Sequence, residues 1–132
     1  EVKHEDQRAF DKLQASIVEN KYFKEPRLTL QELADRLESD ARELSRLINT
    51  VSQRNFSDFI NHIRVGETKR LMALEENKGR PLLNLGLDAG FNSKSAFNSS
   101  FKKETGMTPG EYRRQLAEKN AAAGPATKNA GN

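Results

Sequence analysis

The chain has 132 residues and a mass of 14.9 kDa, which allows one ordinary domain or two very small ones. Hydrophobic residues make up 35% and charged residues 31%, the balance of a globular protein, and no apolar run reaches the ~18 residues of a membrane span. Cysteine is absent, which excludes disulfides and thiolate metal sites.

The charge is unevenly distributed along the chain, although the net charge is only +3. Residues 1–40 contain seven basic and ten acidic side chains, whereas residues 92–132 contain seven basic and three acidic ones. A basic C-terminal part suggests an anionic partner, but a solvated basic surface has the same composition.

The first half of the chain has the apolar period of helices, with no strand alternation of useful length. The first apolar stripe predicts a helix that ends near Tyr22, and it consists of Phe10, Leu13 and Ile17. A second helix is expected to begin after Thr29, with Glu32 completing a capping box.

Two further helices are predicted before the middle of the chain ends. Asp40 is expected to cap the third helix, with Glu43 as its partner three residues later. Asn55 or Ser57 then opens a longer fourth helix, which runs to about Glu76 and stops at the turn "NKGRP".

The pattern of the second and third helices returns in the second half of the chain. The apolar offsets of Leu30, Leu33, Ala34 and Leu37 recur 52 positions later at Leu82, Leu85, Gly86 and Ala89. Phe97 and Phe101 match Leu44 and Ile48 at a shift of 53, so the second turn is one residue longer. We therefore expect both phenylalanines to be core residues of a second helical pair.

A last helix is predicted from Thr108, with Pro109 in its first turn and Glu111 as the capping partner. The final stretch "NAAAGPATKNAGN" has no apolar stripe, which predicts a disordered tail. The expected organisation is an N-terminal helix and connection (1–27), a first helix-turn-helix (28–55), a linker helix (56–78), a second helix-turn-helix with a C-terminal helix (79–119) and the tail (120–132).

The residues that enzymes use are sparse. His4 and His62 are the two histidines, far apart in sequence, and no Gly-rich phosphate loop or cluster with metal-ligand spacing is present. We therefore expect neither catalysis, nor a metal, nor a cofactor.

A paired helix-turn-helix has a direct physical use, because the second helix of such a unit enters the major groove of DNA. That helix needs an apolar back and a polar front whose donors and acceptors meet base edges. In the first unit the predicted front consists of Arg42, Ser45, Arg46 and Asn49. In the second it consists of Ser93, Lys94, Ser95, Asn98, Ser99 and Lys102, with Ser93 or Asn92 as the helix cap.

The stretch "LGLDAGFNSKSAFNSSFKKETGMTPGEYRR" closely resembles the signature of AraC/XylS-type transcription regulators, and the match covers roughly residues 28–116. The residues that stand at the family's spacing are Gly90-Phe91, Phe97, Phe101-Lys102-Lys103, Gly106, Pro109 and Tyr112-Arg113. The resemblance implies an all-α, seven-helix module of two helix-turn-helix subdomains that binds DNA with both recognition helices.

The chain departs from the family's pattern at three places. Gly86 stands where alanine is usual, at a cost to the helix of roughly 0.5–1 kcal/mol. Thr68 replaces a small apolar residue of the linker helix, and the second front has serines where many relatives carry Arg or Gln. We expect Gly86 and Thr68 to allow some freedom between the two units.

The function expected from these observations is sequence-specific binding of double-stranded DNA by the C-terminal domain of a transcription regulator. A helical protein-interaction module without specific readout is the alternative. The resemblance also implies RNA polymerase as a partner, a sensory or oligomerisation domain outside this chain, and a place in the bacterial cytoplasm at the nucleoid. The segment "NFSDFINHIRV" resembles family members whose sensory part is large and sometimes membrane-embedded. For the full-length protein this resemblance implies membrane tethering as one arrangement.

Overall fold

The computed structural model describes the backbone of residues 1–130 and the side chains of residues 1–122. Over residues 1–130 it contains helices and no strand, which confirms the all-α, seven-helix prediction. The elements are α1 (His4–Glu19), η1 (Tyr22–Lys24), α2 (Leu30–Arg36), α3 (Ala41–Ser52), α4 (Phe56–Ala73), η2 (Glu75–Asn77), α5 (Leu82–Asp88), α6 (Lys94–Thr105) and α7 (Pro109–Ala130).

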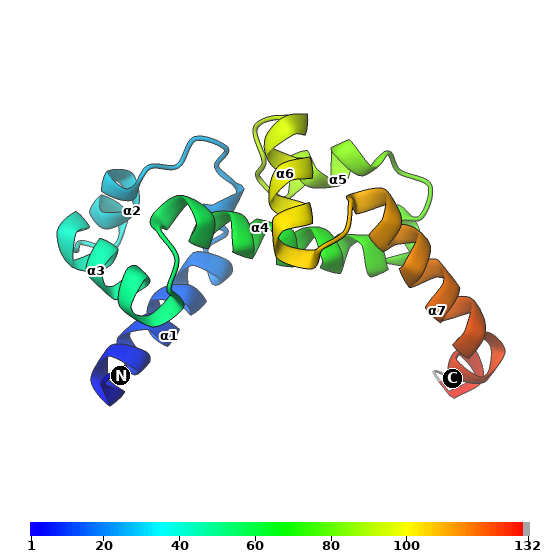
Figure 1. Cartoon of the computed structure of the whole chain (residues 1–132), viewed down its shortest axis with the longest axis horizontal. Coiled ribbons are helices and arrows are strands. Elements are labelled where there is room, and N and C mark those ends of the chain that lie inside the picture. The colour runs from blue at the N-terminus through cyan, green and yellow to red at the C-terminus, as the bar shows by residue number, and fades with distance from the viewer. Residues whose placement is uncertain (131–132) are drawn as a thin grey trace.

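The helices form two groups joined by α4 (Figure 1). Helices α1, α2 and α3 gather around the first part of α4, α6 lies over its middle, and α5 and α7 lie at its second part. The apolar side of α4 changes along its length: Ile60 and Ile63 belong to the first core, whereas Val65 and Met72 belong to the second. The linker helix α4 therefore contributes buried side chains to the cores of both subdomains.

The predicted helix starts are largely confirmed by hydrogen bonds. Thr29 Oγ1 accepts from the Glu32 backbone N–H at 3.1 Å and Glu32 Oε1 accepts from the Thr29 N–H at 2.9 Å. Thr108 and Glu111 form the same reciprocal box at the start of α7. Asn55, rather than Ser57, caps α4.

The start of α3 differs from its prediction. Asp40 caps the helix by accepting from the Arg42 backbone N–H at 3.1 Å. Glu43 does not return a bond to Asp40 but accepts two bonds from Arg46, at 3.1 and 2.7 Å. A charged guanidinium one turn away is a stronger donor for the carboxylate than a neutral backbone N–H.

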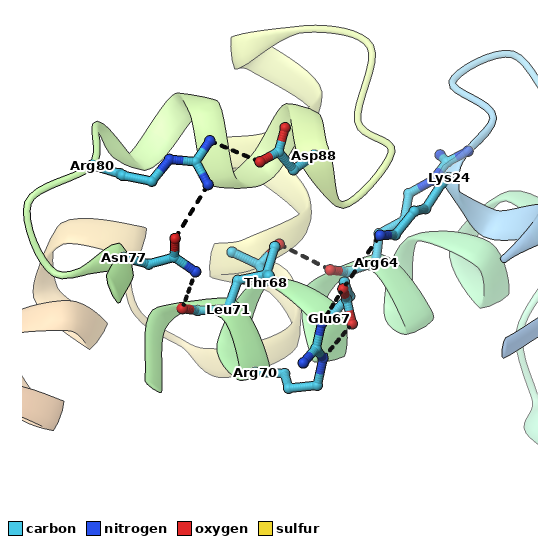
Figure 2. Close-up of polar contacts among 9 residues, drawn as sticks. All are labelled: Lys24, Arg64, Glu67, Thr68, Arg70, Leu71, Asn77, Arg80 and Asp88. Atoms are coloured by element: carbon cyan, nitrogen blue, oxygen red, sulfur yellow. Dashed lines mark hydrogen bonds and ion pairs between the residues drawn. The ribbon is translucent and has the colours of Figure 1, made fainter. Parts of the chain in front are cut away.

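Two helices end earlier than their patterns predict. Helix α1 stops at Glu19 because Lys21 adopts a left-handed conformation with φ 58°. Helix α4 stops at Ala73, and the buried Asn77 then donates from Nδ2 to the Leu71 carbonyl oxygen at 2.9 Å. That bond satisfies a carbonyl of the last turn of α4 (Figure 2).

The C-terminal helix is longer than expected. Helix α7 continues to Ala130, whereas the sequence predicts disorder from residue 120 onward. Three consecutive alanines, residues 121–123, have the highest intrinsic helix propensity and favour helix up to that point, but the Gly124 and Pro125 that follow are poor helix formers, so propensity does not explain the last turns. The last two residues of the predicted tail, 131 and 132, lie outside the described residues.

Packing explains two of the departures from the family's pattern. The ring of Phe97 lies against Gly86, where an added Cβ would be 2.7 Å from ring atoms, so the glycine makes room for the ring. Thr68 is fully buried and donates from its hydroxyl to the Arg64 carbonyl oxygen at 2.9 Å (Figure 2). No buried side-chain nitrogen or oxygen lacks a hydrogen-bond partner among the described side chains, so the Thr68 hydroxyl is satisfied.

Candidate nucleic-acid interface

The first recognition helix, α3, is fixed from behind by three buried side chains. Leu44 and Leu47 are 5% exposed and Ile48 is fully buried, so the opposite side of the helix faces outward. Of the four predicted front residues, Arg42, Arg46 and Asn49 are exposed and Ser45 is half-buried. Arg42 stands in the first turn of α3, where side chains of such helices meet base edges.

Arg46 is exposed, but its guanidinium is paired with two carboxylates of this chain. Its guanidinium donates to Asp6 of α1 through two bonds, Nη1 to Oδ2 at 3.2 Å and Nη2 to Oδ1 at 3.1 Å, in addition to the bonds to Glu43. The hydrogen bonds to Glu43 and Asp6 raise the pKa of Arg46, and those from Arg46 hold the pKa of both carboxyls below their ordinary values. Two carboxylates therefore offset the charge of this predicted DNA contact.

The second recognition helix, α6, has the predicted apolar back. Phe97 is 1% exposed and Phe101 is fully buried, which confirms both as core residues. The rings of Phe91, Phe97, Phe101 and Tyr112 form a continuous series with centroids 5.4–6.0 Å apart. This aromatic series fixes the rotation of α6 about its axis.

The structure places the whole predicted second front outward. Ser93, Lys94, Ser95, Asn98, Ser99 and Lys102 are all exposed. Ser93 is the cap of α6, and its Oγ accepts from the Ala96 backbone N–H at 3.0 Å. No acidic residue stands in the first turn of α6, so this front is positively charged, unlike the surroundings of Arg46.

The two subdomains meet at a close backbone contact that the sequence does not reveal. Gly90, in the turn before α6, has φ +112°, and a Cβ added there would lie 2.3 Å from the Phe23 carbonyl oxygen of η1. Arg64 of α4 donates from Nε to the same carbonyl oxygen at 2.8 Å and from Nη2 to the Glu25 carbonyl oxygen at 2.7 Å. Burial lowers the pKa of Arg64 to about 10, so the guanidinium stays charged at neutral pH.

Two features, a cluster of metal-ligating side chains and a membrane-spanning helix, do not occur in the part of the chain that the structure describes. No group of three or more His, Cys, Asp or Glu side chains is placed to hold a metal ion. Within the same residues no helix has the length and apolar character that crossing a membrane requires.

This domain has two helix-turn-helix units, each with a second helix that is apolar behind and polar in front, which is the arrangement of helix-turn-helix DNA-binding proteins. A family model described as a helix-turn-helix domain matches residues 33–115, more than half of the chain. The chain belongs to the AraC-type helix-turn-helix family of transcription regulators, and it has the DNA-binding domain of that family.

Relatives in this family are named as regulators. The chain is 29% identical over 87 residues to the melibiose operon regulatory protein of Escherichia coli K12, covering 66% of this chain and 28% of that protein. It is 31% identical over 114 residues to the HTH-type transcriptional regulator CdhR of Pseudomonas aeruginosa, covering 86% of this chain and 33% of that protein. The chain thus spans about a third or less of the length of these two relatives.

A solved structure supports the fold. The AraC-type transcriptional regulator from Chromobacterium violaceum superposes with a TM-score of 0.68 and 22% identity, covering 84% of this chain and 96% of that chain. At this identity the likeness shows the common fold alone.

Proposed function

We propose that this domain binds double-stranded DNA in a sequence-specific manner, with α3 and α6 in adjacent major grooves. The observation that carries the proposal is the pair of second helices, each buried along an apolar back and exposed along a polar front. Arg42 on α3 and Asn98 on α6 have the donors and acceptors that base edges require. The remaining front residues, with their lysines and serines, also suit phosphate contacts.

The length of α4 bears on this arrangement. Its 18 residues, rising ~1.5 Å each, give a helix of ~27 Å. Successive major grooves on one face of DNA are about 34–36 Å apart. Helix α3 precedes the start of α4, whereas the C-terminal end of α6 contacts α4 at Asp58 and His62, so the recognition helices are closer together than the two grooves and the DNA would have to bend for one molecule to reach both.

The alternative function is a helical protein-interaction module, and salt dependence separates the two. Fluorescence anisotropy with random duplex DNA across a salt series is expected to show affinity that falls steeply as salt rises, since bound phosphates release counterions. Affinity absent at low salt would favour the protein-interaction module.

We also propose the wider setting in which the domain acts. We place the domain at DNA in the bacterial cytoplasm, acting on transcription through RNA polymerase. A sensory or oligomerisation domain outside this chain would govern when it acts.

A binding site for the protein can be selected from a randomised duplex library. Replacing Arg42 with alanine is expected to weaken binding to that site by about 1–3 kcal/mol and to relax base preference at one position, because a bidentate base contact is lost. Competition binding against single-base variants of the site measures this. An equal loss on specific and random DNA would assign Arg42 to a phosphate and defeat the readout role.

Replacing Asp6 with asparagine is expected to raise DNA affinity, by up to about fivefold, which is the scale of an exposed ion pair. The substitution removes one of the two carboxylates that hold Arg46. Glu5→Gln, which makes the same charge change in the same turn of α1, is the matched control and should have a smaller effect. The Asp6 effect should vanish in an Arg46→Ala background. If it persists there, the gain comes from net charge and not from release of Arg46.

A further inference from the structure

Glu104 joins the second recognition helix to the first subdomain. Its Oε1 lies 2.7 Å from Nδ1 of His62 on α4 and accepts a bond from Nη2 of Arg54 at 3.2 Å. Arg54 stands in the turn that follows α3, whereas Glu104 is in the last turn of α6. The contact therefore connects the C-terminal ends of the two recognition helices.

The carboxylate of this contact is well covered, and its partners are not. The Glu104 side chain is 14% exposed, against 34% for Arg54 and 43% for His62. A covered carboxylate that loses its partners pays a desolvation cost without compensation. Any rotation of the second subdomain that separated Glu104 from Arg54 and His62 would meet this cost.

The other end of α6 is also attached to the first subdomain. The turn that leads into α6 contains Gly90, which lies against the Phe23 carbonyl oxygen and the Arg64 guanidinium. At the C-terminal end, beside Glu104, Lys103 adds an exposed ion pair with Asp58 of α4 at 3.1 Å. A single helix such as α4 would bend and twist if the subdomains touched nowhere else, but α6 is held at both ends.

We propose that Glu104 is a positioning residue for DNA binding, which holds α6 at a set distance and angle from α3 and so makes the protein selective for the spacing between its two half-sites. This inference rests on the proposed use of both recognition helices. A rigid pair of helices gains affinity from the second half-site only when the spacing of the half-sites matches the distance and angle between the helices. A loosely joined pair gains affinity at several spacings. The contact replaces the freedom between units that the sequence suggests with a fixed geometry.

The first test needs no DNA and so does not depend on the proposed function. Because the chain contains no cysteine, Asn49→Cys and Asn98→Cys place one spin label on each recognition helix without background labelling. Double electron–electron resonance on the otherwise unchanged chain is expected to show one narrow distribution of the distance between the two spin labels. Adding Glu104→Gln should broaden or shift it, and Glu118→Gln, the same charge change on the exposed face of α7, should not. An unchanged distribution in the Glu104 variant would overturn the inference.

The second test measures the consequence for binding. Duplexes carry both half-sites of a selected sequence, with one base pair removed or one or two added between them. Wild-type protein is expected to prefer one spacing by about tenfold or more, and Glu104→Gln to reduce that preference to about threefold or less while binding an isolated first half-site equally well. Retention of the wild-type preference by the variant would overturn the inference. A wild-type protein indifferent to the second half-site would instead defeat the proposed function, with the spin-label distances still deciding whether Glu104 fixes α6.

A merely structural role for Glu104 would give a different pattern. It would lower the melting temperature and the affinity for every duplex alike, with no change in spacing preference, and that result would contradict the inference. If Glu104→Gln does not fold, Arg54→Gln serves in its place, because it removes one partner and leaves the His62 contact. The Arg54 variant is expected to show a smaller loss of spacing preference in the same direction.

Discussion

Replacing Phe101 with alanine is expected to lower the free energy of unfolding by about 3–5 kcal/mol. Phe101 is fully buried and lies between two other aromatic rings, 6.0 Å from Phe97 and 5.4 Å from Tyr112 between centroids. Truncation would leave a cavity and remove the two edge-on ring contacts that fix α6 on the second core. Loss of this size is a large part of the ~5–15 kcal/mol that stabilises an ordinary domain.

Thermal and urea unfolding followed by circular dichroism measures the Phe101 effect. Lys102→Ala, the exposed neighbour on the same helix, is the control and should unfold close to wild type. A Phe101→Ala protein that kept its melting temperature but lost nucleic-acid binding would contradict this expectation and show that the ring is a stacking platform and not part of the core.

Replacing Gly90 with alanine is expected to destabilise the fold by at least about 2 kcal/mol, because two separate costs add. At φ +112° an L side chain is strained, and the new Cβ would collide with the Phe23 carbonyl oxygen at 2.3 Å and approach Arg64 Nε to 2.9 Å. Backbone and a buried guanidinium give way only if the subdomains move apart. The variant should therefore also lose part of its DNA affinity.

Gly106 provides the matched control for Gly90. It has φ +78° at the end of α6, but an added Cβ there would have nothing within 4 Å. Gly106→Ala carries the conformational strain without the collision, so its cost is expected to be limited to about 1–2 kcal/mol. Equal destabilisation of the two variants in chemical unfolding would show that the contact at Phe23 contributes nothing.

The features of the fold that the sequence predicts are those carried by residues close together in the chain. The Thr29–Glu32 and Thr108–Glu111 boxes depend on partners three residues apart, and both form as expected. The apolar spacing of Phe97 and Phe101 predicts their burial, since a helix places residues four apart on one side. Helix ends are less predictable, because a left-handed residue such as Lys21 or a side chain such as Asn77 decides them.

The features that the sequence does not predict join residues far apart in the chain. Asp6 meets Arg46 across 40 positions, and Glu104 meets His62 and Arg54 across 42 and 50. Charge patterning alone gives no partner at such separations. The composition of both fronts is therefore predictable from the sequence. The pairing of Arg46 with two carboxylates and the attachment of α6 to the first subdomain become visible only in the folded structure.

Footprinting of purified protein on a duplex selected from a randomised library, with light scattering of the complex, tests directly whether one chain binds two adjacent major grooves. Two recognition helices on one chain are not related by the two-fold symmetry of a dimeric repressor, so one molecule is expected to bind a non-palindromic site. We expect protection of two adjacent major grooves, about 10–10.5 base pairs apart, by a complex that contains one protein chain. Protection of a single groove per chain, or a strict requirement for an inverted repeat, would contradict it.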